Sequence, residues 1–222
     1  MSALTPPPRR LRRLAALGLT LLLIATASVV VLLVDFQLKN QVGHHPLPGG
    51  ETVDIPQLDG QISDSEYAFH YYDAKIRMDL YWTIVGDIIY LALKSPAHGW
   101  LAISLAPTGP QMLGGDILIG YVEDRRVQMR DDYADTPTSH TADMVLGGSN
   151  DILAYVGSES DQGTIIELER KLTTLDRYDR PIVPTDMPVE LAYSNGKDFN
   201  SYHDQNRDSV LINFFTGKIT QP

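Results

Sequence analysis

The most regular pattern in the chain is an alternation of apolar and polar residues in short segments after residue 51. In residues 76–84, "IRMDLYWTI", every second position is apolar. This period-two pattern is typical of a β-strand with one buried face. The same criterion predicts further strands at residues 87–94, 99–106, 116–123, 127–133, 152–159, 164–171, 188–194 and 209–215.

Turn-forming residues separate these segments. Gly, Pro, Asn or Asp bounds each of them, and the sequence contains neither a long amphipathic helical pattern after residue 51 nor an internal repeat. Many short strands joined by turns predict an all-β fold, an antiparallel β-sandwich, over residues 51–222.

The N-terminal region has a different pattern. Residues 14–34, "LAALGLTLLLIATASVVVLLV", are uncharged and follow four arginines within residues 9–13. A run of about 20 apolar residues is long enough to cross a bilayer, so it predicts one transmembrane helix that acts as a signal-anchor. By the positive-inside rule, residues 1–13 form a cytoplasmic basic tail and the C-terminal domain is extracytoplasmic in a single-pass protein of the cell membrane.

A cleavable signal peptide is the competing interpretation, because Ala25, Thr26 and Ala27 resemble a cleavage site. The apolar run continues beyond this point, which favours an uncleaved anchor. Residues 35–50 lack periodicity and end in Pro and Gly, so they predict a linker.

Charge is distributed unevenly across this boundary. The chain has 18 basic and 28 acidic residues, a net charge of −10; residues 1–39 hold five basic and one acidic, which leaves 13 and 27, or −14, for residues 40–222. An acidic domain argues against nucleic acid as a partner. The absence of cysteine excludes disulfides, thiolate ligands and covalent haem attachment.

One acidic segment raises the question of a metal. Residues 131–143, "DDYADTPTSHTAD", contain Asp131, Asp132, Asp135, His140 and Asp143. The spacing is not that of an EF-hand loop. A polar connection whose aspartates cap turns is the favoured interpretation, and an ion site is the alternative.

Two other residues suit a redox metal. Met112 lies in the glycine-rich turn "GPQMLGGD", and His203 lies in the polar segment "NSYHDQN", 91 positions away. A thioether and an imidazole together suit haem iron or copper. Spacing alone favours the simpler interpretation, in which Met112 fills a packing gap and His203 is solvated.

Several motifs in order resemble the DOMON family. They are "LDGQISDSEY" (58–67), "HGWLAISLAPTGPQMLGGDILIGY" (98–121) with the "RDDYADTPTSHTAD" that follows it (130–143), "ELERKLTTLDRYDRPI" (167–182) and "ELAYSNGKDFNSYHDQNRDSVLINFF" (190–215). Together they cover most of the predicted exported domain.

The resemblance implies an immunoglobulin-like β-sandwich that binds b-type haem or sugar. In haem-binding members a Met and a His matching Met112 and His203 hold the iron, and their retention here favours haem b. Trp100, Tyr121, Tyr202 and Phe214 are candidates for the pocket wall, and Gly114 and Gly115 for close approach to a flat macrocycle. Because two protein ligands leave iron no open position, we expect an electron-transfer module and not an enzyme.

Two other functions stay open. The sugar-binding branch of the family, with Tyr71, Tyr72 and Trp82 as candidate exposed aromatics, implies a carbohydrate or small-ligand binding module without haem. An acidic domain also suits an envelope interaction domain. An electron carrier without a flavin domain would need a separate redox partner protein.

Overall fold

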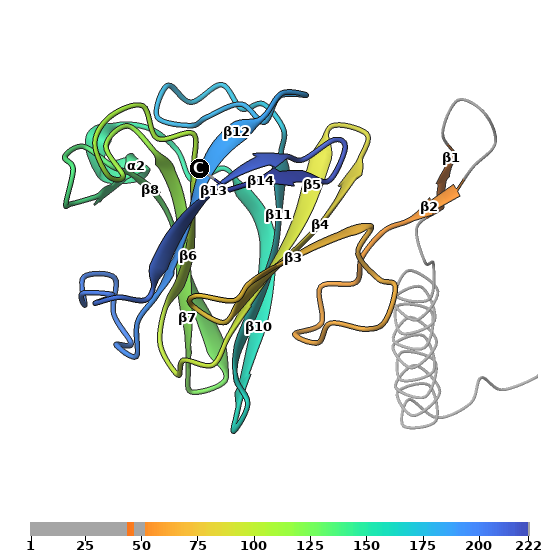
Figure 1. Ribbon diagram of the computed structural model, residues 1–222, viewed down its shortest axis with the longest axis horizontal. Coiled ribbons are helices and arrows are strands. Elements are labelled where there is room, and N and C mark those ends of the chain that lie inside the picture. Colours follow the sequence, from red (N-terminus) through yellow and green to blue (C-terminus); the bar gives the residue numbers. More distant parts are fainter. Residues whose placement is uncertain (1–43, 47–51, 222) are drawn as a thin grey trace, which may run out of the picture. The chain divides into compact units, whose positions relative to one another are not determined.

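The computed structural model describes residues 44–46 and 52–221 (Figure 1). The predicted cytoplasmic tail and transmembrane helix, residues 1–34, lie outside the described residues, as does most of the predicted linker. In the described part of the chain, no helix is long and apolar enough to cross a membrane. One short strand, β1 (His44–Pro46), falls within the predicted linker and pairs with β2 (Thr52–Asp54).

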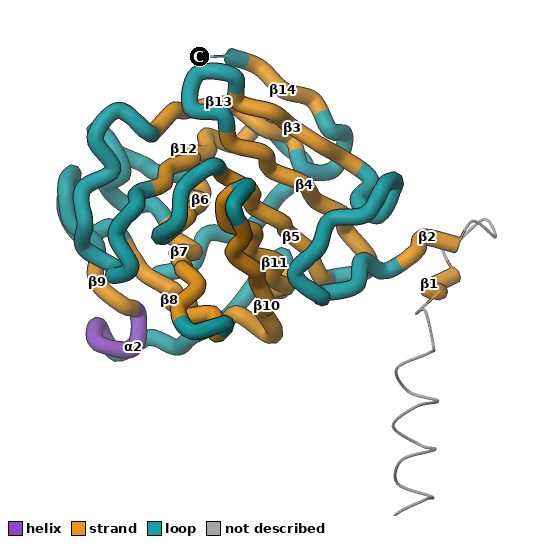
Figure 2. The backbone as a smooth tube through the Cα atoms, turned by 90° about the horizontal axis from the view of Figure 1, so that it is seen from below, coloured by secondary structure: helices purple, strands orange, loops and turns teal. Residues whose placement is uncertain are grey.

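Two antiparallel sheets make up most of the described chain (Figures 1 and 2). The five-stranded sheet consists, in spatial order, of β10 (Ile152–Ser160), β11 (Gly163–Lys171), β5 (Ile88–Ser95), β4 (Met78–Val85) and β3 (Phe69–Asp73). The seven-stranded sheet consists of β14 (Lys218–Thr220), β13 (Arg207–Asn213), β12 (Met187–Tyr193), β6 (Leu101–Leu105), β7 (Asp116–Glu123), β8 (Arg126–Tyr133) and β9 (Thr141–Ala142). The single helical turn α2 (Asp143–Leu146) follows β9.

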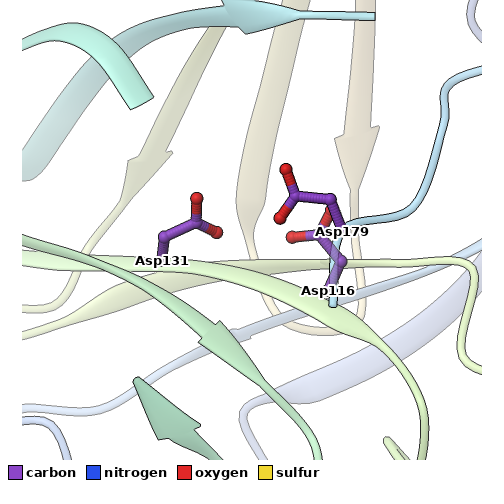
Figure 3. Close-up of side chains that lie close together, drawn as sticks. All are labelled: Asp116, Asp131 and Asp179. Carbon is purple, nitrogen blue, oxygen red and sulfur yellow. The ribbon is translucent and has the colours of Figure 1, made fainter. Parts of the chain in front are cut away.

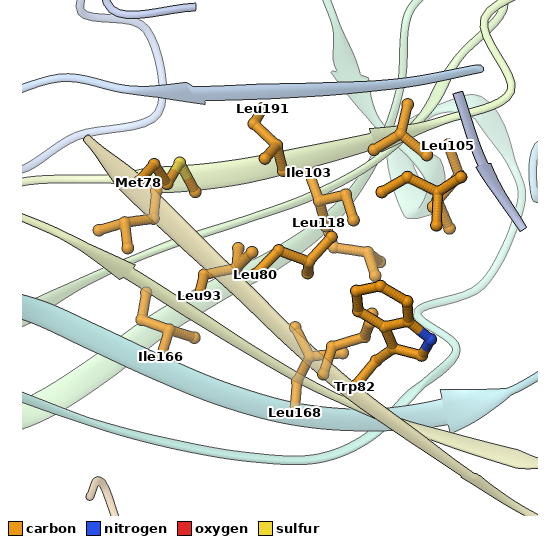
Figure 4. Close-up of a cluster of buried hydrophobic side chains, with 14 of the residues drawn as sticks. Met78, Leu80, Trp82, Leu93, Ile103, Leu105, Leu118, Ile166, Leu168 and Leu191 are labelled. Carbon is orange, nitrogen blue, oxygen red and sulfur yellow. The ribbon is translucent and has the colours of Figure 1, made fainter. Parts of the chain in front are cut away.

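The core lies between the two sheets. Leucine, isoleucine and methionine side chains from both sheets meet there around Trp82 (Figure 4). The indole Nε1 of Trp82 donates a hydrogen bond to the carbonyl of Phe214 at 2.9 Å, and the two rings pack edge to face. Burying one large apolar side chain stabilises the fold by about 1.5–3 kcal/mol. The predicted all-β sandwich is therefore confirmed at the level of two packed antiparallel sheets.

This core corrects two predictions from the sequence. Trp82 was a candidate exposed aromatic, but it is fully buried because its position on β4 faces the core. Phe214 was a candidate for a pocket wall, but it packs in the same core. Tyr72 is 49% exposed, as a surface aromatic would be.

The seven-stranded sheet has two different faces. On β6, Leu101, Ile103 and Leu105 point into the core, whereas Ala102 lies in a second, smaller apolar cluster on the opposite face. The alternation of a strand requires this division. The outer face carries the pocket described below.

Candidate functional site

A cavity of about 400 Å³ lies over the outer face of the seven-stranded sheet. Its floor comes from three adjacent strands, with Ala102 of β6 paired to Ile119 of β7 on one side and to Ala192 of β12 on the other. Ser104 and Glu190 continue this floor. The small side chains at the centre leave room above the sheet. The volume of the cavity is within the size range of small-molecule sites.

Loops at the two ends of the floor form the walls of the cavity. Met112 comes from the loop between β6 and β7, and His203 comes from the loop between β12 and β13. Both residues line the cavity, together with Trp100 and Tyr202. The fold thus brings the four predicted site residues to one cavity.

Hydrogen bonds fix the loop that carries Met112. The amide of Gly115 donates to the Met112 carbonyl at 2.8 Å, and Arg180 Nε donates to the Gly114 carbonyl at 2.7 Å. Gly114 has φ +76°, and a Cβ there would collide with Thr108 Oγ1. The positive φ of Gly114 therefore serves a tight turn, and the close approach of Gly114 and Gly115 to a macrocycle stays a prediction.

The contacts of His203 leave one ring nitrogen available. Its Nδ1 lies 3.2 Å from the carbonyl oxygen of Asp204 and 3.3 Å from Nη1 of Arg207. Among the described residues, Nε2 has no hydrogen-bond partner. Burial, and to a lesser extent the charge of Arg207, lower the pKa of His203. The neutral imidazole is the form that binds a metal.

Aromatic side chains surround His203. The Trp100 ring lies edge-on at 6.3 Å between centroids, and its Nε1 donates to the Ser201 carbonyl at 3.0 Å. The Tyr202 ring lies 4.6 Å from the imidazole and is 65% exposed. Tyr121 contacts Phe199 beside the same apolar cluster.

The acidic segment divides between the two faces of the sheet. Asp131 and Asp132 belong to strand β8, as the predicted strand at residues 127–133 requires, so these two aspartates are not part of a turn-capping connection. Asp132 is fully buried and accepts a hydrogen bond from His140 Nδ1 at 2.5 Å, and His140 lines the cavity. Asp135 stays at the surface and accepts hydrogen bonds from Ser139 and Thr141.

Asp131 belongs to a buried carboxylate cluster, defined as Asp116, Asp131, Asp143 and Asp179, that lies on the core side. Arg170 of β11 pairs with Asp116 at 2.7 Å and with Asp179 at 3.3 Å. Burial and the charges of Asp116 and Asp179 raise the pKa of Asp131 and of Asp143 to about 8. Arg180 links this cluster to the Met112 loop, because its backbone amide donates to Asp116 at 2.8 Å.

Glu190 and His140 are among the cavity residues that sequence reasoning did not assign to the site. Glu190 lies between Val189 and Leu191, which face the core, so strict alternation on this strand could have placed it on the outer face. No sequence signal indicated that a loop would bring His140 to the cavity.

The fold and site define an all-β protein with a cavity on one sheet face. The family model of the DOMON domain matches residues 75–196, more than half of the chain. The chain therefore belongs to the DOMON family. The matched residues include Met112, whereas His203 lies beyond them.

Curated relatives match this chain over part of their length. DBH-like monooxygenase protein 1 of Homo sapiens is 28% identical over 151 residues, which are 67% of this chain and 24% of the relative. The Mus musculus protein of the same name is 27% identical over 131 residues, 58% of this chain and 21% of the relative. The matched region thus spans less than a quarter of these relatives.

Two solved structures are similar to the chain. The cytochrome b domain of pyranose dehydrogenase from Coprinopsis cinerea has a TM-score of 0.47 and 17% identity, over 63% of this chain and 78% of that domain. The cytochrome domain of Myriococcum thermophilum cellobiose dehydrogenase has a TM-score of 0.41 and 13% identity, over 77% of this chain and 87% of that domain.

Proposed function

We propose that this DOMON domain binds one non-covalent b-type haem in the outer-face cavity, with Met112 and His203 as the axial ligands, and acts as an electron-transfer module. The observation that carries the proposal is that these two residues, 91 positions apart, line the same cavity. The proposal goes beyond membership of the DOMON family, because it names a ligand and the two residues that would bind it.

The donor set and the cavity suit haem. A thioether and a neutral imidazole are both ligands of haem iron, and the Met/His combination raises the reduction potential. The apolar floor of Ala102, Ala192, Ile117 and Ile119 offers a surface for a macrocycle. Lys75 and Arg207 also line the cavity and offer cations for the carboxylates of a haem.

The protein's own residues would hold and shield the group. The Met112 loop, fixed by its turn and by Arg180, presents the thioether without a large entropy cost. Trp100, anchored through Nε1 to Ser201, restricts the position of the His203 ring. Bound haem would supply one-electron chemistry, and two protein ligands would leave no open site for a substrate, so we propose a carrier and not an enzyme.

The cellular setting is also a proposal. A transmembrane signal-anchor at residues 14–34 would hold the domain outside the cytoplasm, and a separate redox partner would exchange electrons with it. The immunoglobulin-like class of the sandwich stays a prediction. The net charge of −14 over residues 40–222 suits a basic partner protein and disfavours nucleic acid.

Reconstitution of the full chain with haem tests the proposal. We expect a sharp α-band of low-spin haem on reduction, lost or converted to a high-spin spectrum in Met112→Ala and in His203→Ala. The matched control is Met144→Ala, because Met144 is 69% exposed and does not line the cavity. A wild-type chain that takes up no haem, or a low-spin spectrum that survives in both variants, would overturn the assignment.

A carbohydrate-binding module is the second candidate function. The observation in its favour is the 65% exposed Tyr202 ring beside the cavity, which offers an apolar face for a sugar. Calorimetry of the haem-free chain against a glycan panel tests it. Binding that is lost in Tyr202→Ala would support this function, and no binding across the panel would exclude it.

A further inference from the structure

The buried carboxylate cluster lies in the sandwich interior, on the opposite side of the seven-stranded sheet from the proposed haem cavity. Asp116 and Asp131 come from β7 and β8, and Asp179 comes from the segment between β11 and β12. These three carboxylates converge on one another (Figure 3). One oxygen of each lies within 4.8 Å of the others.

The hydrogen bonds of the cluster satisfy only half of its oxygens. Oδ2 of Asp116 and Oδ2 of Asp179 accept hydrogen bonds from Arg170, and Oδ2 of Asp131 accepts the amide hydrogen of Asp151 at 2.8 Å. Oδ1 of each of these aspartates is buried and has no partner among the described residues. Buried carboxylate oxygens without donors are strongly unfavourable.

A fourth aspartate adds an independent indication of a ligand. Asp143, at the start of α2, is 1% exposed, and its Oδ1 also lacks a partner among the described residues. It directly follows Ala142, which pairs with Asp132 on β8, so the chain brings Asp143 beside Asp131. Four carboxylates face one guanidinium in this interior, and the cluster is three positive charges short of neutrality when fully ionised.

We propose that the buried carboxylate cluster binds a divalent cation, calcium by its coordination preference. Calcium takes six to eight oxygen ligands at about 2.3–2.6 Å. Two such bonds span up to about 5 Å, so oxygens within 4.8 Å of one another suit a single ion. Arg170 keeps the Oδ2 atoms of Asp116 and Asp179 in place, which leaves their Oδ1 atoms for the ion.

The buried carboxylate cluster lies where several segments of the domain meet. Asp116 directly follows the turn Gly114–Gly115, and Arg180 connects it to this turn through its amide and its Nε. A bound cation would hold the start of β7, the start of α2 and the segment around Asp179 together. The proposal does not depend on haem, and its test uses the haem-free chain.

Calcium titration of the chelator-stripped full chain tests the proposal. We expect binding of one Ca²⁺ per chain with a Kd of about 10⁻⁴ M or tighter by calorimetry, and weaker binding of Mg²⁺. Saturating Ca²⁺ should raise the thermal midpoint of the wild-type chain. No heat and no thermal shift with millimolar Ca²⁺ or Mg²⁺ would overturn the proposal.

Substitution of single aspartates distinguishes a carboxylate that binds Ca²⁺ from one that only stabilises the fold. Asp131→Asn and Asp143→Asn should each weaken Ca²⁺ binding more than about tenfold. In chelator each should preserve or raise the thermal midpoint, because a neutral amide replaces a carboxyl whose neutral form burial already favours. Asp161→Asn, at an exposed turn, is the control and should change neither value. Variants that lose stability in chelator yet keep the full calcium shift would contradict the assignment.

Discussion

Asp131 and Asp132 are neighbours on β8, yet they serve two different regions of the molecule. Asp131 points between the sheets, where its Oδ1 has no partner among the described residues. Asp132 points to the outer face, where Arg130 and His140 satisfy its carboxylate. One strand thus supplies a carboxylate with an unpartnered oxygen to the interior cluster and a hydrogen-bonded carboxylate to the outer face, because successive side chains alternate between faces.

The difference between the two regions lies in the kind of ligand that each suits. The outer region is an open cavity over alanine and isoleucine with two soft, neutral donors, Met112 and His203. The inner region is closed and offers only hard oxygen atoms. Soft donors in an open apolar cavity suit haem iron, and a closed oxygen cage suits a hard cation.

The largest effect on stability is expected when the buried carboxylate cluster loses the positive charge of Arg170. Arg170→Met leaves Asp116 and Asp179 buried without a positive partner, so the free energy of unfolding should fall by about 3–5 kcal/mol. Guanidinium denaturation followed by tryptophan fluorescence measures it. Arg126→Met, at an exposed position of β8, is the control and should have no measurable effect. A loss below about 1 kcal/mol would mean that the pairing of Arg170 is of little consequence.

Glu167, a buried carboxylate outside the cluster, shows the effect of burial on the pKa when hydrogen-bond donors are present. Glu167 accepts hydrogen bonds from the amides of Gly60 and Asp59 and from the hydroxyl of Tyr67. Burial nevertheless raises its pKa to about 7. The folded state therefore favours the neutral acid, and this stabilisation is present below pH 4.5 and lost as the pH rises through about 7.

Glu167→Gln should remove this pH dependence. Between pH 5 and 8, the decrease in the free energy of unfolding should be smaller in the variant than in the wild type by about 2 kcal/mol. Denaturant unfolding at the two pH values measures it, with the exposed Glu123→Gln as the control. Identical pH profiles for wild type and Glu167→Gln would show that the hydrogen bonds offset the burial completely.

Neighbouring substitutions on β8 should have opposite signs. Asp132→Asn weakens charge-assisted hydrogen bonds to Arg130 and His140, so it should destabilise the protein by about 1–2 kcal/mol. In chelator, Asp131→Asn should be neutral or stabilising, because burial already favours a neutral group at this position. Thermal denaturation of both variants measures the contrast. Equal destabilisation would remove the distinction between the two faces.

The smallest effects concern the two faces of β6. Ala102→Leu fills the cavity floor, so haem affinity should fall by about tenfold or more, or about 1.4 kcal/mol, with little change in stability. Ile103→Val faces the core and should lower stability by about 0.5–1.5 kcal/mol while haem binding is preserved. Haem titration and denaturation of both variants measure these effects. Lower stability in Ala102→Leu with lower haem affinity in Ile103→Val would contradict the assignment of the two residues to opposite faces.

Much of the fold could be predicted from the sequence, because alternation is a local property. The predicted segment 116–123 is β7 to the residue, and the segment 164–171 differs from β11 by one residue at its start. The short strands β3, β9 and β14 were missed, since two to five residues carry too little periodicity. The predicted transmembrane helix lies outside the described residues and stays a prediction.

The site was predictable only through family motifs, because it joins residues distant in sequence. Spacing gives no reason for Met112 and His203 to meet. The buried carboxylate cluster as a whole was missed. Asp131 and Asp143 were interpreted as part of a polar connection, with an ion site as the alternative, and no sequence signal joined Asp116 and Asp179 to them. The alternation of β8 held a usable signal, since Asp131 shares the core-facing parity of Met129.

Anomalous diffraction at the iron absorption edge, from crystals of the haem-loaded chain, tests the central claim most directly. The account predicts one iron per chain over the outer face of the seven-stranded sheet, bonded to Met112 Sδ and His203 Nε2 at about 2.0–2.4 Å. An iron held by other residues, or haem bound away from this cavity, would contradict it.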